Sequence, residues 1–177
     1  MRFLLPLIVC LAVPFAMSKP ASAAPLEDFA KGPNGQWSFF TDRVMGGVSS
    51  GSAKLTSNAL LLEGAVSTAN NGGFIQVRRR VDLPADATAI RLRVRGNGQR
   101  YYLHLRTGGT PLPWQYYQAG FDAPRGWTDV TIPLSDFVPS GRVMRSAVRP
   151  GSVRTLAVVA YGRDHDARIE VAEISVQ

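Results

Sequence analysis

Apolar and polar residues alternate along the chain with the short period of β-strands rather than the longer period of helices. No stretch of a dozen residues keeps apolar positions at a spacing of three and four. The 17 glycines and 12 prolines divide the chain into short runs rich in β-branched and aromatic residues. These runs predict strands within 55–64 and over 74–81, 89–95, 101–106, 116–121, 127–134, 153–161 and 168–176. Strands this short and numerous are typical of an antiparallel sandwich or barrel, and we expect an all-β fold with a single jelly-roll β-sandwich.

Residues 90–105 predict a β-hairpin. Asn97-Gly98 is a dipeptide preferred in two-residue type I′ turns, because both central residues of such a turn need positive φ. Closing the turn there would place Leu92 opposite Leu103 and sort apolar residues to one face and cations to the other. The polar face is then either a solvated surface or a surface for an anionic or sugar-like ligand. Its candidate binding residues are Arg93, Tyr102 and His104.

Two further runs predict particular strand environments. Thr155–Tyr161 is almost continuously apolar, which is typical of a central strand covered on both faces. In the last strand the apolar residues change from odd-numbered to even-numbered positions between Val171 and Ile174, which predicts a β-bulge.

The first 23 residues have the three-part pattern of a secretory signal peptide. Arg2 supplies the positive start, 3–17 is almost wholly apolar, and 21–23 reads Ala-Ser-Ala. The apolar run is short and interrupted by proline, which disfavours a membrane span. We therefore expect residues 1–23 to be a signal peptide and residues 24–177 to form one exported domain, periplasmic or secreted.

Removing this leader changes the cysteine content and the charge of the chain. The one cysteine, Cys10, lies in the leader, so the remaining domain has no thiol and must be stable without a disulfide. Arg2 and Lys19 also leave, which lowers the 20 cations to 18 against 13 acids and the net charge from +7 to +5. Such a charge favours anionic membrane surfaces or acidic glycans as partners. Nucleic acid is disfavoured because no nucleic-acid-binding signature or basic helix accompanies the charge.

Two short patterns resemble catalytic or metal sites. Gly47–Gly51 fits the G-x-S-x-G pattern of serine hydrolases, with Ser49 as nucleophile, but the following residues read as strand rather than helix. Asp164-His165-Asp166 reads as a polar turn, because no second cluster of ligands has metal-binding spacing. No base, nucleophile and orienting group can be assembled from the side chains, so we expect a binding protein without catalytic residues, metal or cofactor.

The segment 111–117 carries aromatic residues that suit a sugar-binding platform. Trp114 and Tyr116 are its candidate binding residues. The alternative is that these rings cover the core or a loop, which is the more common role of aromatic side chains.

Two segments with glycine pairs are the most distinctive in the chain. The first contributes the candidate binding residues Asp42, Arg43, Met45, Gly46, Gly47 and Ser49; the second contributes Asn71, Gly72, Gly73 and Arg78. Glycine pairs permit unusual φ values and close approach of two backbones. We expect the apolar side chains Val44 and Met45 to pack against the sandwich, and Asp42 to pair with Arg78 across the two close-approach points.

These segments resemble a known family. The motifs that carry the resemblance are Asp42-Arg43-Val44-Met45-Gly46-Gly47-Val48-Ser49, Asn71-Gly72-Gly73-Phe74 with Arg78, Arg95–Tyr101, and Trp127 with Ile132-Pro133-Leu134 and Phe137. Over roughly 29–174 the chain is similar to the complex I intermediate-associated protein 30 family. The resemblance implies a galactose-binding-like β-sandwich, close in architecture to some carbohydrate-binding modules, and a chaperone or assembly factor acting without turnover. The expected partner is a protein, such as a membrane complex, and the alternative is a polysaccharide of the envelope or the extracellular space.

The leader makes a direct prediction. If residues 1–23 are a signal peptide, the exported protein begins at Ala24 or within a residue or two of it. Sequencing the N-terminus of the protein recovered from outside the cytoplasm measures this. Recovery of cytoplasmic protein that keeps Met1 would show that the chain is not exported.

Overall fold

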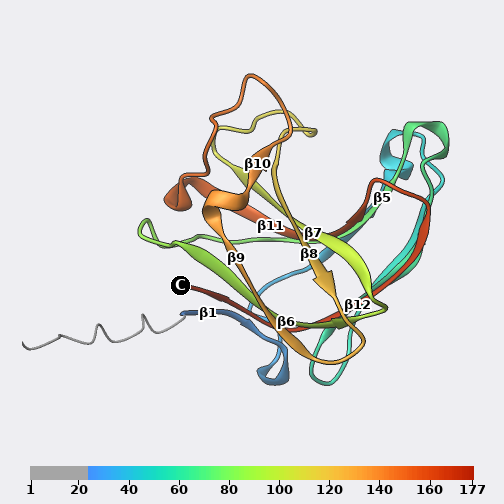
Figure 1. Cartoon of the computed structure of the whole chain (residues 1–177), viewed down its shortest axis with the longest axis horizontal. Helices are drawn as coiled ribbons and strands as arrows, with labels where there is room; N and C mark the ends of the chain where they lie inside the picture. Colours follow the sequence, from blue (N-terminus) through green and yellow to red (C-terminus); the bar gives the residue numbers. More distant parts are fainter. Residues whose placement is uncertain (1–23) are drawn as a thin grey trace, which may run out of the picture.

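The alternating strands form two antiparallel sheets that pack face to face (Figure 1). The computed structural model describes residues 24–177, so the expected signal peptide, 1–23, lies outside the described residues. In the first sheet the strand order is β3 (Ser50–Leu55), β4 (Leu60–Val66), β12 (His165–Val176), β6 (Ala89–Gly96) and β9 (Thr128–Pro133), with β1 (Ala24–Asp28) also paired to β12. In the second sheet the order is β10 (Val138–Pro139), β8 (Tyr117–Ala123), β7 (Gln99–Thr107), β11 (Val153–Tyr161), β5 (Phe74–Arg80) and β2 (Ser38–Thr41).

The helical content of the described part is confined to short 3₁₀ turns. They are η1 (Phe29–Lys31), η2 (Asp42–Met45), η3 (Ala69–Asn71), η4 (Leu134–Asp136) and η5 (Pro150–Ser152). Within residues 24–177 no helix is long and apolar enough to cross a membrane. The expected all-β sandwich is confirmed.

The core lies between the sheets and is built by the strands' alternation. Ile90, Leu92 and Val94 of β6 and the facing residues Leu103 and Leu105 of β7 are completely buried. Burying one such side chain contributes about 1.5–3 kcal/mol. The inward positions of both sheets therefore supply the main driving force for folding.

The predicted hairpin at 90–105 is wrong, although its apolar and polar positions were assigned correctly on β6. Strand β6 pairs with β12 and β9, whereas β7 pairs with β11 and β8, so the two strands belong to different sheets. A type I′ turn needs positive φ at both central residues. The connecting turn has positive φ at Gly98 but not at Asn97, so it is not a type I′ turn. The apolar residues of β6 and those of β7 point into one core from opposite sides. This arrangement produces the same alternation of apolar and polar residues as a hairpin with one buried face.

The predictions for the last two strands are confirmed. Strand β11 lies in the interior of the second sheet, between β7 and β5, and 156–160 is buried on both faces. In β12 the register with β6 shifts between Val171 and Glu173, where the bulge was expected. The bulge returns Ile174 and Val176 to the core side after the parity change.

A buried ion pair connects the two sheets near their edges. Glu27 of β1 accepts a hydrogen bond from the Arg79 guanidinium of β5, and Arg79 also lies over the Trp37 ring. The backbone N–H of Asn34 donates a second bond, of 2.9 Å, to the other oxygen of Glu27. Because Arg79 points to the interior side of β5 and successive strand side chains point to opposite faces, Arg78 and Arg80 point to the outer side.

Leu103 tests the assignment of the core. Leu103→Asp should unfold the domain, because it places an unpaired carboxylate between the two sheets. Arg93→Ala should change the free energy of unfolding by no more than about 0.5 kcal/mol, because the Arg93 side chain is exposed. Chemical denaturation of both variants measures this, and the reverse ranking would show that the buried and exposed faces are exchanged.

Candidate functional site

Asp42 is a buried carboxylate that joins the two glycine-pair segments. Its side chain is fully buried at the start of η2, in the connection from β2 to β3. One oxygen accepts the backbone N–H of Ser49 at 2.9 Å, and the other accepts the Ser49 hydroxyl. The second oxygen also accepts the backbone N–H groups of Gly73, at 2.6 Å, and Phe74, at 3.3 Å. We call Asp42 with these partners the Asp42 clasp.

The glycine pairs are the points of close approach that the sequence predicted. A Cβ atom at Gly47 or at Gly72 would overlap the Asp42 carboxylate. Gly46 and Gly73 adopt positive φ values of 90° and 123°, which L side chains rarely adopt. Side chains at these positions would push the two connections apart, so the clasp requires the glycines.

The hydrogen bonds of the clasp determine the charge state of Asp42. Burial alone would raise the pKa of its carboxyl, but the bonds donated by Gly73, Ser49 and Phe74 outweigh burial and lower the pKa below its ordinary value. Asp42 is therefore ionised at neutral pH, and its negative charge is balanced by N–H and O–H dipoles.

The expected ion pair between Asp42 and Arg78 is wrong. Asp42 uses main-chain donors instead, while the Arg78 guanidinium lies over the Phe40 ring, 4.7 Å from its centroid, on the outer face of the second sheet. Arg78 forms no ion pair with any residue of 24–177 that the structure describes. The second glycine pair thus reaches Asp42 through its backbone rather than through the arginine that follows it.

The apolar side chains beside the clasp are exposed, in contrast to the expectation that they pack. Val44 is 74% exposed, Met45 63% and Val48 47%. The clasp orders the backbone of this turn, so these side chains need not be buried to hold it in place. We call Val44, Met45 and Val48 the apolar turn; η2 and η3 lie side by side at the upper right of Figure 1.

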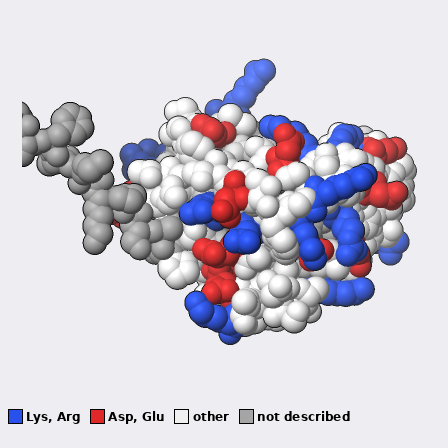
Figure 2. Space-filling model, turned by 60° about the horizontal axis from the view of Figure 1, so that its bottom comes forward, with Lys and Arg blue, Asp and Glu red and all other residues white. Residues whose placement is uncertain are grey.

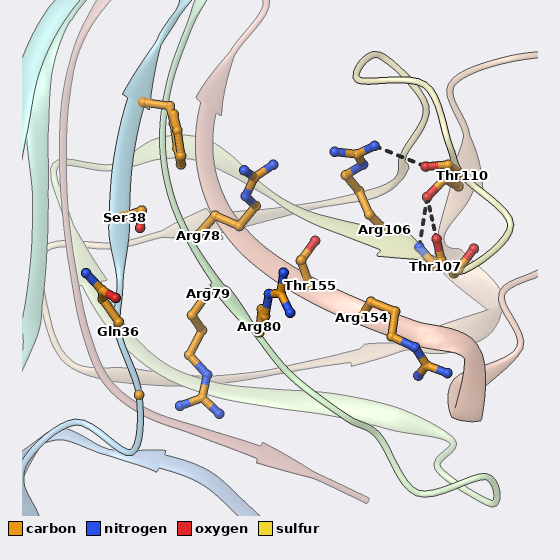
Figure 3. Close-up of a pocket in the computed structure, with 12 residues that line it drawn as sticks. Gln36, Ser38, Arg78, Arg79, Arg80, Arg106, Thr107, Thr110, Arg154 and Thr155 are labelled. Carbon is orange, nitrogen blue, oxygen red and sulfur yellow. Dashed lines mark hydrogen bonds between the residues drawn. The ribbon is translucent and has the colours of Figure 1, made fainter.

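A groove of about 560 Å³ lies on the outer face of the second sheet (Figure 3). Its floor is formed by side chains that point outward from four neighbouring strands, β2, β5, β11 and β7. The residues that line it are Gly35, Gln36, Ser38, Phe40, Arg78, Arg79, Arg80, Arg106, Thr107, Thr110, Arg154 and Thr155. We call this cavity the arginine groove.

Five arginines and no acidic residue line the arginine groove; the guanidinium of Arg79 points to the interior side of β5, whereas those of Arg78 and Arg80 point to the outer side. Arg79 and Arg154 have acidic partners outside it, namely Glu27 and Asp82. On the first sheet, by contrast, Arg91 bonds Asp129 and Arg95 bonds Glu170, both at 2.8 Å. Figure 2 shows a face on which blue and red side chains are interleaved in this way. The groove is therefore a local concentration of unbalanced positive charge.

An aromatic cluster continues the outer face beside the groove. The rings of His104 and Tyr116 stack with centroids 4.0 Å apart, and Tyr161 meets His104 edge-on at 5.8 Å. Tyr102 packs edge-on against Tyr161 at 6.0 Å. Burial lowers the pKa of His104 to about 4, an effect that the neighbouring Gln118 opposes only in part, so the imidazole is neutral at pH 7. Burial and the nearby Tyr161 raise the pKa of Tyr116.

The structure divides the predicted binding residues among several places. Asp42, Gly46, Gly47, Ser49, Asn71, Gly72 and Gly73 lie in or beside the clasp, with Arg43 and Met45 exposed on the same turn. Tyr102, His104 and Tyr116 share the outer face of the second sheet with Arg78. Arg93 does not join them, because β6 lies in the other sheet. Trp114 is 65% exposed in the loop that precedes Tyr116.

Several residues of the outer face were not singled out from the sequence: Phe40, Arg80, Arg106, Thr155 and Tyr161. Alternation does place Arg80 with Arg78, and Arg106 with His104, on one side of each strand. The missing information was that β5, β11 and β7 are neighbours, which brings these positions together.

The two patterns that resemble catalytic or metal sites have structural roles. The Ser49 hydroxyl is buried and bonded to Asp42, where a substrate cannot reach it. Asp164 accepts bonds from the backbone N–H and hydroxyl of Thr68, at 2.6 and 2.7 Å, and thereby holds the start of η3. The neighbouring His165 lies with its Nδ1 atom 2.8 Å from the carbonyl oxygen of Arg163.

A family model covers almost all of the described chain. The model of the complex I intermediate-associated protein 30 family matches residues 27–171. The chain belongs to this family. The clasp and the arginine groove both lie inside the matched range, so they are features of a family member's domain rather than of an appendage. No curated protein matches the chain in sequence.

Solved structures similar to this family member share its fold at low sequence identity. The family 11 carbohydrate-binding module of the cellulosomal cellulase Lic26A-Cel5E of Clostridium thermocellum is 14% identical, with a TM-score of 0.70 over 89% of this chain and 95% of that chain. The family 11 carbohydrate-binding module from Clostridium thermocellum in complex with a β-1,3-1,4-mixed-linked tetrasaccharide is 13% identical, with a TM-score of 0.69 over 88% of this chain and 96% of that chain. The agarase AgWH50C is 12% identical, with a TM-score of 0.61 over 88% of this chain and 24% of that chain. These likenesses establish the jelly-roll fold of carbohydrate-binding modules for this family member.

The clasp predicts which variants are energetically coupled. Asp42→Asn should destabilise the domain by about 3 kcal/mol, because it replaces one acceptor oxygen by an NH2 group that faces buried donors, and it removes the negative charge that these donors stabilise. Ser49→Ala should cost about 1–2 kcal/mol, and the double variant less than the sum, because the two side chains bond each other. Arg78→Ala should instead add to Asp42→Asn without coupling. Denaturant unfolding of the three single and two double variants measures these changes, and coupling to Arg78 with none to Ser49 would contradict the clasp.

The effect of Asp42→Asn should depend on pH. Since the folded state lowers the pKa of Asp42, its ionised form stabilises the fold above the unfolded value of about 3.9, and this contribution is lost as pH falls through the lower folded-state value. The difference in stability between the parent protein and the variant should therefore shrink below about pH 4.

Proposed function

We propose that this protein is an exported, non-catalytic binding domain that acts as an assembly factor, or chaperone, for a protein complex. Membership of the complex I intermediate-associated protein 30 family supports the assembly role. The observation that carries the proposal is the apolar turn, whose side chains are exposed although its backbone is held by buried hydrogen bonds.

A rigid turn with exposed apolar side chains suits binding of a protein. Large apolar side chains in water are stabilised when a partner covers them, and a preordered turn loses little conformational entropy on binding. Val44 and Met45 lie next to each other on η2, and Val48 follows on the same connection. Together they offer an apolar contact that the clasp holds in one orientation.

A second candidate function is binding of a polysaccharide. It is supported by the outer face of the second sheet, where Tyr102, Tyr116 and Tyr161 lie beside an open groove lined by hydroxyl, amide and guanidinium groups. Aromatic faces next to fixed polar groups suit the apolar and hydroxyl surfaces of sugar rings. The fold similarity to carbohydrate-binding modules agrees with this candidate.

Affinity purification of the tagged protein from its native cells tests the assembly role. Replacing Val44 and Met45 together by serine should remove the co-purifying protein complex, by at least about tenfold, while the domain stays folded, because both side chains are exposed. Val143→Ser, at an apolar side chain that is 95% exposed elsewhere, is the matched control and should retain the complex. A complex that survives the double substitution, or a preparation that carries only polysaccharide, would contradict the assembly role.

A further inference from the structure

We propose that the arginine groove is a binding site for the anionic groups, carboxylate or sulfate, of an acidic polysaccharide. This inference rests on the second candidate function, whose ligand it narrows by charge, and it is independent of the assembly role. Its basis is a row of unpaired guanidinium and hydroxyl groups on three neighbouring strands.

Strand register brings the row together. Thr155 of β11 lies opposite Arg80 of β5 on one side and opposite Arg106 of β7 on the other. In the next outward row of the same strands, Ala157 lies between Arg78 and His104. Thr155 and Ala157 thus form a floor with arginines on both sides of Thr155 and one arginine beside Ala157, and Figure 3 shows Thr155 between Arg80 and Arg106.

The guanidinium groups are oriented but not neutralised. The Arg78 guanidinium lies over the Phe40 ring, which holds the side chain without neutralising its charge. Arg106 donates from one terminal nitrogen to the carbonyl oxygens of Thr110 and Leu112, at 3.0 and 2.9 Å, which fixes the side chain without cancelling its charge. Within residues 24–177, Arg78, Arg80 and Arg106 form no ion pair. Burial lowers the pKa of Arg78, and the like charge of Arg106 lowers it further.

Three residues that line the groove have a buried polar atom without a hydrogen-bond partner in the described chain: Nε of Arg79, which points to the interior side of β5, Nε of Arg106 and the hydroxyl oxygen of Thr155. Buried polar groups are almost always hydrogen-bonded in folded proteins. An oxyanion placed between Arg78, Arg80 and Arg106 would reduce the repulsion between cations and accept the bond that Arg106 Nε leaves unmade.

The surroundings favour a sugar chain over an acidic peptide. Strands β5, β11 and β7 are each paired on both sides, so the floor offers no free strand edge for an extended peptide. Phe40 is the one apolar side chain lining the groove, and the remaining lining side chains are hydroxyl, amide or guanidinium groups. Hydroxyl-rich sugar rings match such a lining, and the tyrosines beside it provide flat faces for stacking.

Binding of defined polysaccharides to the purified domain, residues 24–177, tests the inference. Polygalacturonate and a sulfated glycan represent the two anionic groups, neutral mixed-linkage β-glucan represents an uncharged chain, and polyglutamate represents an acidic peptide. We expect one or both acidic glycans to bind, with an affinity that falls as salt is raised. Arg78→Gln, Arg80→Gln and Arg106→Gln should each weaken this binding by about tenfold or more.

Arg125→Gln is the matched control, because it also removes one positive charge. Arg125 lies in the exposed turn between β8 and β9, past the end of β8 that is remote from Arg106. This variant should leave the affinity within about twofold. Arg80→Gln keeps the test valid if Arg106→Gln disturbs its loop, since the Arg80 side chain makes no hydrogen bond within residues 24–177.

Each other outcome overturns the inference in a distinguishable way. Binding of the neutral glucan with no response to the groove variants would retain the polysaccharide function and exclude the anionic site. Equal losses with Arg125→Gln would show attraction by net charge alone, and preference for polyglutamate would assign the groove to a protein. Binding of none of the four would remove both the anionic site and the polysaccharide candidate.

Discussion

The structure depends on one buried carboxylate that ties two crossings between the sheets. The chain passes from the second sheet to the first at η2, between β2 and β3, and returns at η3, between β4 and β5. Asp42 lies in the first crossing and accepts the backbone N–H groups of Gly73 and Phe74 in the second. An ionised carboxylate in this position is stable only while each oxygen is hydrogen-bonded, so it holds both crossings in one arrangement.

Both candidate binding surfaces follow from this clasp. The apolar turn is the outer side of the first crossing, and it is exposed because the carboxylate, rather than apolar packing, holds the backbone. Strand β5 begins at Phe74, where the clasp ends, so the same bonds fix the start of the strand that presents Arg78 and Arg80 to the groove. Glu27 and Arg79 hold the other end of this strand from its interior side. The two faces of β5 thus separate a structural arginine from the arginines available for a ligand.

The distribution of charge distinguishes binding from folding in this molecule. On the first sheet, exposed arginines face carboxylates of neighbouring strands, and such exposed pairs contribute little to stability. In the groove, Arg78, Arg80 and Arg106 remain without carboxylates although the charges of Arg78 and Arg106 repel each other. An arrangement that costs stability and lines an open cavity is better explained by a ligand than by the fold.

The sequence by itself determined most of the strands, although not β1, β2 and β10, together with the sandwich, the bulge in β12 and the two glycine pairs as points of close approach, because alternation, β-branched runs and glycine reflect local geometry. Only the tertiary structure decided which sheet each strand joins. Strands β6 and β7 have the alternation of a hairpin, yet they face each other across the core, because alternation shows which side of a strand is buried and does not show which strand is its neighbour.

The tertiary structure also decided the partners of Asp42. Main-chain N–H groups occur at almost every residue, so no side-chain pattern could distinguish those of Gly73 and Phe74, whereas Arg78 was the conspicuous but wrong choice. The row of Arg80, Thr155 and Arg106 likewise arises only when strands far apart in the chain become neighbours.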